Sequence, residues 1–281
     1  MVIAISTSET GAIQTIERSC PLCETDNSSQ PLHHYSDPFW RLKQCPQCDF
    51  VYIENAPRYE HMSADLAWEK TFQVEEQRRK AARGHEYTLS KNTRWRMALL
   101  PRKKFPALLR QHAQPGNVID IGCGDGAQML GLDRAFIPHG IEVSAELSQQ
   151  AQQVFQTLGG FVVHAPSLEG LQQCDNNYFS AATLRSYLEH EMHPQPVLKE
   201  IFRILQPGGV AIIKVPNYGS LNRHIMGRDW CGFRFPDHLN YFTPATLKAM
   251  ALRVGFDVKY GLTYKLPTSD NMYVRLVKTS L

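Results

Sequence analysis

The sequence has no long hydrophobic run and no strong excess of either charge. No window approaches the roughly 18 consecutive apolar residues that a membrane-spanning helix needs. Lysine and arginine number 30 against 27 aspartates and glutamates, and this net charge of +3 indicates no particular partner. The first residues carry neither a basic leader nor a long apolar core. We therefore expect no signal peptide, no membrane partner and a cytoplasmic location.

Disulfides are also not expected, although the chain has seven cysteines. The number is odd, and no secretory signal is predicted, so a disulfide framework is disfavoured. Two C-x-x-C pairs are typical of a structural zinc site, because each turn directs two thiolates at one point and two turns complete a tetrahedron. Four unliganded cysteines and a redox pair are the alternatives. The predicted zinc ligands are Cys20, Cys23, Cys45 and Cys48.

A glycine-rich bend follows an apolar stretch near the middle of the chain. Val118–Ile121 predicts a buried strand, and the three alternate glycines of Gly122–Gly126 predict a bend where a ligand can approach the backbone. The apolar residues of Ala127–Phe136 predict a helix packed on the sheet. A strand, a glycine bend and a helix form a cofactor cradle at the carboxyl end of a parallel strand.

The charges around this bend help to distinguish between two cofactors. The glycine spacing also satisfies the dinucleotide fingerprint, so spacing alone does not decide. Asp120 precedes the first glycine and Asp125 lies inside the bend. Two carboxylates would repel a pyrophosphate, but they suit the ammonium and sulfonium of S-adenosylmethionine. Glu142 ends the next apolar segment, where a carboxylate can accept the ribose hydroxyls of either cofactor.

Five segments of the chain occur together in a known family. They are VIDIGCGDG at 118–126, GIEVS at 140–144, LEH at 188–190, ILQPGGV at 204–210 and VPN at 215–217. With them, about residues 116–281 resemble the class I S-adenosylmethionine-dependent methyltransferases. The resemblance implies an α/β fold: a Rossmann-like doubly wound methyltransferase sheet, here with a small N-terminal zinc-binding module and a helical connector. The candidate cofactor-binding residues are Asp120, Gly122, Cys123, Gly124, Asp125, Gly126, Glu142, Ser167, Leu168 and Arg185.

The chain is expected to have three parts. Residues 1–57 form a tail and the zinc-binding module, 58–114 a helical connector, and 115–281 the S-adenosylmethionine-dependent domain. Residues 1–18 are expected to be a loose tail. Arg78–Arg110 holds eleven basic residues. This favours either a site for an anionic substrate such as RNA or, more simply, a solvated helix face.

The catalytic half carries further strand and helix signals. Phe161–His164, Phe179–Leu184 and Val210–Val215 predict strands, with a turn at 207–209 before the last of them. A helix is predicted over Pro194–Leu205. Another is predicted to begin at Thr243-Pro244, because threonine is a good cap and proline suits the first helical position, and to end at glycine 255.

Histidines follow the predicted fourth strand and a later loop. Methyl transfer is an in-line displacement at a carbon that the sulfonium already activates, so the protein mainly has to align the acceptor. An acceptor that loses a proton also needs a base, and histidine has a suitable pKa. His190 and His238 are the candidate bases, and Tyr241 is a candidate for orienting an acceptor hydroxyl. Alternatively, His190 only contacts the cofactor and Tyr241 only lines the pocket.

The sequence thus predicts a methyltransferase for a small-molecule acceptor, at oxygen or carbon, of the sugar or secondary-metabolite type. The paired cysteine hooks before this fold also resemble deoxysugar C-methyltransferases. One alternative is an RNA base methyltransferase that uses the zinc ribbon for docking. Another is a non-enzymatic zinc protein that keeps the fold as a scaffold. The sequence indicates no oligomeric state.

Overall fold

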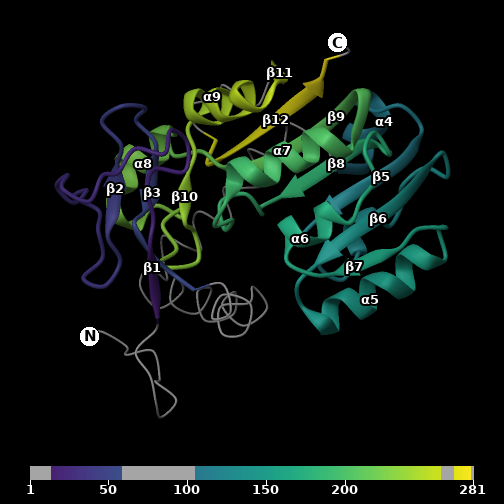
Figure 1. Cartoon of the computed structure of the whole chain (residues 1–281), viewed down its shortest axis with the longest axis horizontal. Helices are drawn as coiled ribbons and strands as arrows, with labels where there is room; N and C mark the ends of the chain where they lie inside the picture. The colour runs from purple at the N-terminus through teal and green to yellow at the C-terminus, as the bar shows by residue number, and fades with distance from the viewer. Residues whose placement is uncertain (1–13, 59–104, 261–268, 280–281) are drawn as a thin grey trace.

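The computed structural model describes residues 14–58, 105–260 and 269–279. A seven-stranded sheet forms its centre, in the order β11-β12-β9-β8-β5-β6-β7 (Figure 1). The strands from β5 to β9 pair in parallel, whereas β12 pairs antiparallel with both β9 and β11. Their bounds are β5 (Gly116–Ile121), β6 (Phe136–Glu142), β7 (Val162–His164), β8 (Phe179–Arg185), β9 (Leu205–Pro216), β11 (Phe256–Tyr260) and β12 (Asn271–Lys278). This mostly parallel sheet fits the predicted Rossmann-like fold.

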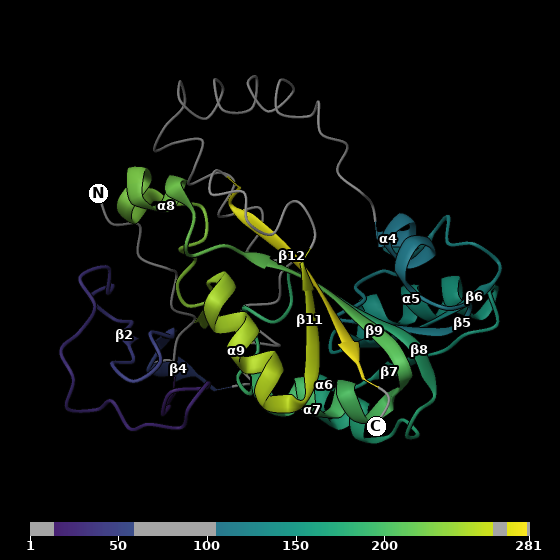
Figure 2. The same cartoon turned by 90° about the horizontal axis from the view of Figure 1, so that it is seen from above.

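Helices cover both faces of the sheet (Figure 2). α6 (Ser167–Gln172), α7 (Pro194–Ile204) and α9 (Pro244–Val254) pack on one face, against side chains such as Ile119 and Leu184. α4 (Phe105–His112) and α5 (Ala145–Gln156) pack on the other, against residues such as Val118 and Ala181. Side chains alternate between the faces along a strand, so both faces of the central strands are buried.

The sheet reverses its winding direction beside β5. The chain runs from β5 outward through β6 to β7 and then returns to β8 on the other side of β5. In open α/β sheets, ligands bind at such a switch point, outside the carboxyl ends of the strands. The residues that follow β5, β6 and β8 therefore meet at the expected ligand position.

Several predicted elements are confirmed, with small changes at their ends. β7, β8 and α7 match their predicted ranges within one residue. α9 begins at a capping box made by Thr243 and Thr246 and ends at Gly255, whose φ is +106°. The turn predicted at 207–209 lies inside the longer β9. There, β8 pairs with Leu205 and next with Val210, so the residues between them bulge out of the register.

The helix predicted over Ala127–Phe136 is wrong. Only Ala127–Met129 forms one short 3₁₀ turn (η1), and Phe136 already begins β6. Gly131 has a left-handed backbone (φ +81°), and the Asp133 carboxylate accepts a hydrogen bond from the Ala135 amide. Both features favour a turn over a continuous helix.

The N-terminal module shares a sheet and a core with the catalytic half. Its β2 (Leu42–Gln44) and β3 (Val51–Ile53) form a three-stranded sheet with β10 (Asn240–Tyr241), which comes from the other end of the chain. The Phe50 ring lies 5.2 Å from that of Phe242, and both belong to the core cluster under α7 and α9. The module is thus packed directly on the sheet domain.

Two other expectations concern the chain outside these elements. The loose tail over 1–18 is wrong for Thr15–Glu17, which forms β1 and pairs with β4 (Asn55–Pro57); residues 1–13 lie outside the described part. Most of the predicted connector, 59–104, also lies outside it, and α4 is its described helix. The three-part division stays a prediction.

No helix within residues 14–58, 105–260 or 269–279 combines the length and the apolarity that crossing a bilayer requires.

Candidate functional site

The three glycines after β5 all have left-handed backbones, with φ +68° at Gly122, +57° at Gly124 and +78° at Gly126. Residues with a side chain rarely adopt this conformation. A Cβ on Gly122 would lie 2.7 Å from the Tyr187 ring, and one on Gly126 would lie 2.9 Å from Phe155. A Cβ on Gly124 would meet no atom of the described residues within 4 Å. Gly124 is therefore where a ligand can approach the backbone.

Glu142 at the end of β6 holds this bend in shape. Its Oε2 accepts a 2.9 Å hydrogen bond from the Gly124 amide, and its Oε1 accepts one of 2.9 Å from the Ser144 amide. The side chain is buried. Each carboxylate oxygen keeps a second lone pair, so Glu142 can still accept hydroxyl hydrogens from a ribose.

Asp120 lies at the centre of the site, on β5. It is only 2% exposed and accepts a 2.5 Å hydrogen bond from the Thr183 hydroxyl on β8. Burial raises the pKa of Asp120 to about 7, against the opposing effects of Thr183 and Arg185. A ligand with an ammonium group would favour the ionised form and lower this pKa.

The other predicted cofactor residues lie around the cradle with different orientations. Asp125 is exposed, and its Oδ1 accepts the Ala127 amide hydrogen. Arg185 at the end of β8 is exposed and donates to Gln128. The Cys123 side chain faces inward, because a Cβ on Gly140 would lie 2.5 Å from its Sγ. Cys123 can therefore offer the ligand only its backbone.

Ser167 and Leu168 begin α6, just after β7. Ser167 is buried, and Leu168 packs against the main core. Their place after the third parallel strand is at the same edge of the sheet as Gly124 and Glu142. The expected adenine contact stays a prediction.

His190 lies in the loop after β8 and is oriented by Asp237. Its Nδ1 is 2.9 Å from the Asp237 backbone oxygen and 3.1 Å from Asp237 Oδ1. Both partners are acceptors, so Nδ1 carries the proton and Nε2 keeps a lone pair in the neutral ring. Arg234 Nη2 lies 2.6 Å from the second oxygen of Asp237.

The charges of this pair influence each other. Burial lowers the pKa of His190, but the carboxylates of Asp237 and Glu189 outweigh this effect, so the pKa lies above its ordinary value. Burial alone would raise the pKa of Asp237, yet His190 and the neighbouring cations bring it down to about 2. Asp237 was not among the candidate site residues from the sequence. Its signal was that it begins the segment 237–243, which resembles a stretch at the substrate pocket of small-molecule members of the family.

His238 and Tyr241 are both deeply buried. The His238 ring meets that of His190 edge to face at a centroid distance of 4.7 Å, and its Nδ1 is 2.8 Å from the Gly232 backbone oxygen. Burial lowers the pKa of His238 well below its ordinary value, so the ring is neutral. Burial raises the pKa of Tyr241, and its hydroxyl has no hydrogen-bond partner among the described residues.

Glu189 completes the cluster around His190. It is 1% exposed, and its Oε2 has no hydrogen-bond partner within the described ranges. Glu189, His190 and His238 each offer one ligand atom within 4.8 Å of the other two. The arrangement can hold a cation or accept a proton.

The four predicted zinc ligands come together in the N-terminal module. The Sγ atoms of Cys20 and Cys48 lie 3.5 Å apart, as do those of Cys23 and Cys45. A tetrahedral zinc with bonds of about 2.3 Å to sulfur needs sulfur atoms roughly 3.8 Å apart. The four-thiol donor set and its spacing therefore fit a structural zinc ion.

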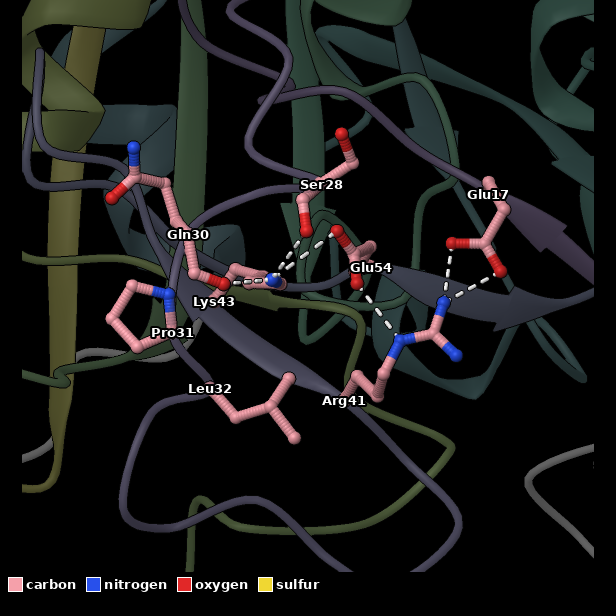
Figure 3. Close-up of a pocket in the computed structure, with 8 residues that line it drawn as sticks. All are labelled: Glu17, Ser28, Gln30, Pro31, Leu32, Arg41, Lys43 and Glu54. Atoms are coloured by element: carbon pink, nitrogen blue, oxygen red, sulfur yellow. Dashed lines mark hydrogen bonds and ion pairs between the residues drawn. The ribbon is translucent and has the colours of Figure 1, made fainter.

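A hollow of about 420 Å³ on the N-terminal module is separate from this site (Figure 3). None of its lining residues belongs to the cradle. Arg41 pairs with Glu17 and, at 2.8 Å, with Glu54; Lys43 Nζ lies 3.6 Å from Glu54. These charged groups satisfy one another, so the hollow is held together by its own ion pairs.

Comparisons with known proteins match the part of the chain that contains the glycine bend. A family model described as a methyltransferase domain matches residues 93–260, more than half of the chain. An uncharacterized 37.1 kDa protein in transposon TN4556 of Streptomyces fradiae is 32% identical over 114 residues, 39% of this chain and 33% of that protein. The ubiquinone biosynthesis O-methyltransferase of Psychrobacter arcticus is 29% identical over 152 residues, 50% of this chain and 58% of that protein. The chain thus spans less than two thirds of the length of either relative.

Among the solved structures that match this chain is a SAM-dependent methyltransferase, possible histamine N-methyltransferase, from Thermotoga maritima. It is 19% identical, with a TM-score of 0.49 over 69% of this chain and 98% of that chain.

Proposed function

The chain belongs to the methyltransferase domain family, and we propose that it transfers the methyl group of S-adenosylmethionine to an oxygen or carbon atom of a small-molecule acceptor. The observation that carries the proposal is the open face of Gly124, placed beside Glu142 and the buried Asp120 at the switch point of the sheet. A small-molecule acceptor is supported by a relative named for O-methylation in ubiquinone biosynthesis, and within that class we propose an acceptor of the sugar or secondary-metabolite type.

The residues of the cradle would each hold one part of the cofactor. Asp120 would face the cationic amino group, Glu142 the ribose and the Gly124 backbone the chain between them. Ser167 and Leu168 would meet the adenine. When bound, S-adenosylmethionine supplies a methyl group on a cationic sulfur. Water is poorly placed to reach Asp120, because this side chain is almost fully buried.

His190 is the base in this proposal. Because Asp237 holds its Nδ1 proton, Nε2 can take the proton of an acceptor hydroxyl or an acidic C–H. As the acceptor atom bonds to the methyl carbon, the bond from that carbon to sulfur breaks. Tyr241 offers its buried hydroxyl for orienting the acceptor.

A coupled assay that measures loss of the methyl donor, run over phenolic, sugar and keto-acid acceptors, tests the proposal. Donor-dependent turnover of at least one such acceptor is the expected result.

An RNA acceptor would instead give an electrophoretic shift. Phosphate contacts are strongest at low salt, so a shift is sought below about 100 mM salt. For a small-molecule enzyme we expect no shift even there. A robust shift, together with methylated RNA, would overturn the small-molecule proposal.

His238→Ala is expected to lower turnover and to leave cofactor affinity unchanged. The His238 ring packs against His190 but makes no hydrogen bond to the described cradle residues. Without it, the His190 ring loses its lateral support, which should cost about 10-fold in kcat because misplaced groups react slowly. Steady-state kinetics and calorimetry with S-adenosylmethionine check the two parts. Weaker cofactor binding with normal turnover at saturation would contradict this role.

We also propose that the four-cysteine cluster holds one structural zinc ion. Four thiolate ligands leave no open coordination position, so this zinc would stabilise the module and take no part in the reaction. Metal analysis of protein purified without chelator should give about one zinc per chain. Cys45→Ser should lose most of that zinc, whereas Cys174→Ser, at a cysteine outside the cluster, should keep it. Metal-free wild-type protein that is fully folded would refute the site.

A further inference from the structure

Arg18 connects the N-terminal module with the loop that carries His190. It lies two residues before Cys20, and its backbone amide donates to the Glu54 oxygen at 2.9 Å. Its guanidinium donates to the backbone oxygen of Ile53 at 3.3 Å and to that of Met192 at 2.9 Å. One side chain thus joins the end of β3 to the loop after β8.

Asn240 holds the same loop from the other side of this contact. Its Oδ1 accepts a 3.0 Å hydrogen bond from Arg18. Its Nδ2 donates to the backbone oxygens of Leu188 at 3.1 Å and Glu191 at 2.6 Å. The amides of Leu239 and Asn240 both donate to the Glu189 oxygen. The carbonyl groups on both sides of His190 are therefore held by Arg18 and by β10.

These bonds are buried and long-range. Asn240 is 2% exposed and pairs with Tyr52 of β3. The Arg18 guanidinium is a charged donor, and it points at two backbone oxygens and at the buried Asn240 amide. Charge-assisted hydrogen bonds of this kind fix geometry more firmly than neutral ones. None of the contacts that Arg18 makes with described residues involves the cradle glycines.

We propose that Arg18 and Asn240 are positioning residues, through which the N-terminal module holds the His190 loop in its reactive geometry. This inference rests on the proposed function of His190. It implies that the module controls the rate of methyl transfer and not the affinity for the cofactor. The cysteine cluster contributes by ordering the segment from which Arg18 projects.

The test compares Arg18→Ala with Arg41→Ala. Arg41 is an arginine of the same module, but its ion pairs go to Glu17 and Glu54 on the hollow of Figure 3. For Arg18→Ala we expect unchanged zinc content, unchanged affinity for S-adenosylmethionine and a kcat lowered by about 10- to 100-fold, since a small misplacement has effects of this size. Arg41→Ala should keep the wild-type kcat.

The pH profile and hydrogen exchange separate positioning from general damage. In Arg18→Ala the midpoint of the kcat profile should move to lower pH, because His190 aligns less well with Asp237. Amide hydrogen exchange should become faster in residues 187–193 but not in β5. Arg18→Lys should restore only part of the rate, because one ammonium replaces a planar fork of donors.

Two results would overturn the inference. One is an Arg18→Ala protein with wild-type kcat, midpoint and exchange. The other is an Arg41→Ala protein as impaired as Arg18→Ala, which would indicate nonspecific damage to the module. If the wild-type protein proves to have no methyltransferase activity, the proposed function fails instead, while the exchange of residues 187–193 still reports whether Arg18 holds the loop.

Discussion

Gly124→Arg is expected to abolish the binding of S-adenosylmethionine. The wild-type protein should bind it with micromolar affinity, measured by calorimetry. An arginine side chain would occupy the open space in front of Gly124, and its Cβ would also strain a backbone at φ +57°. A change from micromolar affinity to no binding at millimolar ligand corresponds to at least about 4 kcal/mol.

Gly208→Arg is the matched control for the strain. Gly208 also has a left-handed backbone (φ +77°), and a Cβ there would meet no atom of the described residues within 4 Å. It lies in the bulge near the start of β9, away from the carboxyl ends of the strands. We expect Gly208→Arg to bind the cofactor normally, with a small loss of stability.

The same titration tests the other interpretations of the cradle. If the wild-type protein fails to bind S-adenosylmethionine at millimolar concentration, the fold is a scaffold and the enzyme proposal is lost. If it binds a nicotinamide dinucleotide instead, Asp120 and Asp125 do not select a cation as we infer. Normal binding by Gly124→Arg would show that the ligand lies elsewhere.

The sequence was informative where the determining contacts are local. The bend at Gly122–Gly126 was predictable because positive φ values leave glycine as the favoured residue. The cap at Thr243 was predictable because its contacts are also local: its side-chain hydrogen bonds reach only to Thr246. The helix expected after Gly126 failed because its apolar residues suited a helix while Gly131 and Asp133 favoured turns.

The rest of the site depends on contacts between distant parts of the chain. Asp237 lies 47 residues from His190, and Met192 lies 174 residues from Arg18. The pairing of β10 with β3 joins segments from opposite ends of the sequence. No periodicity or spacing indicates such pairs, so a single sequence could name His190 as a candidate base without showing what orients it.

His190→Ala is expected to lower kcat by roughly 10²- to 10⁴-fold, the usual contribution of a general base. Cofactor affinity should stay unchanged, because none of the described hydrogen bonds of His190 reaches the glycine bend. His193→Ala is the control. His193 is a nearby exposed histidine at the start of α7, and its replacement should leave kcat unchanged. Single-turnover rates at saturating cofactor measure the chemical step directly.

The dependence of kcat on pH tests whether His190 is the group that titrates. A base must be neutral to accept a proton, so the rate should rise with pH and level off above the pKa of His190. Asp237 raises that pKa, so the midpoint should lie above the ordinary value for a histidine. Asp237→Asn removes the negative charge, so its midpoint should move to lower pH while the plateau falls, because the ring loses its orientation.

A chelator that leaves the four-cysteine zinc in place should not change the wild-type rate, whereas chelator sensitivity would indicate a cation held by Glu189, His190 and His238. A rate that does not vary with pH, or a His190→Ala variant within a few-fold of wild type, would show that the acceptor needs no base from this loop.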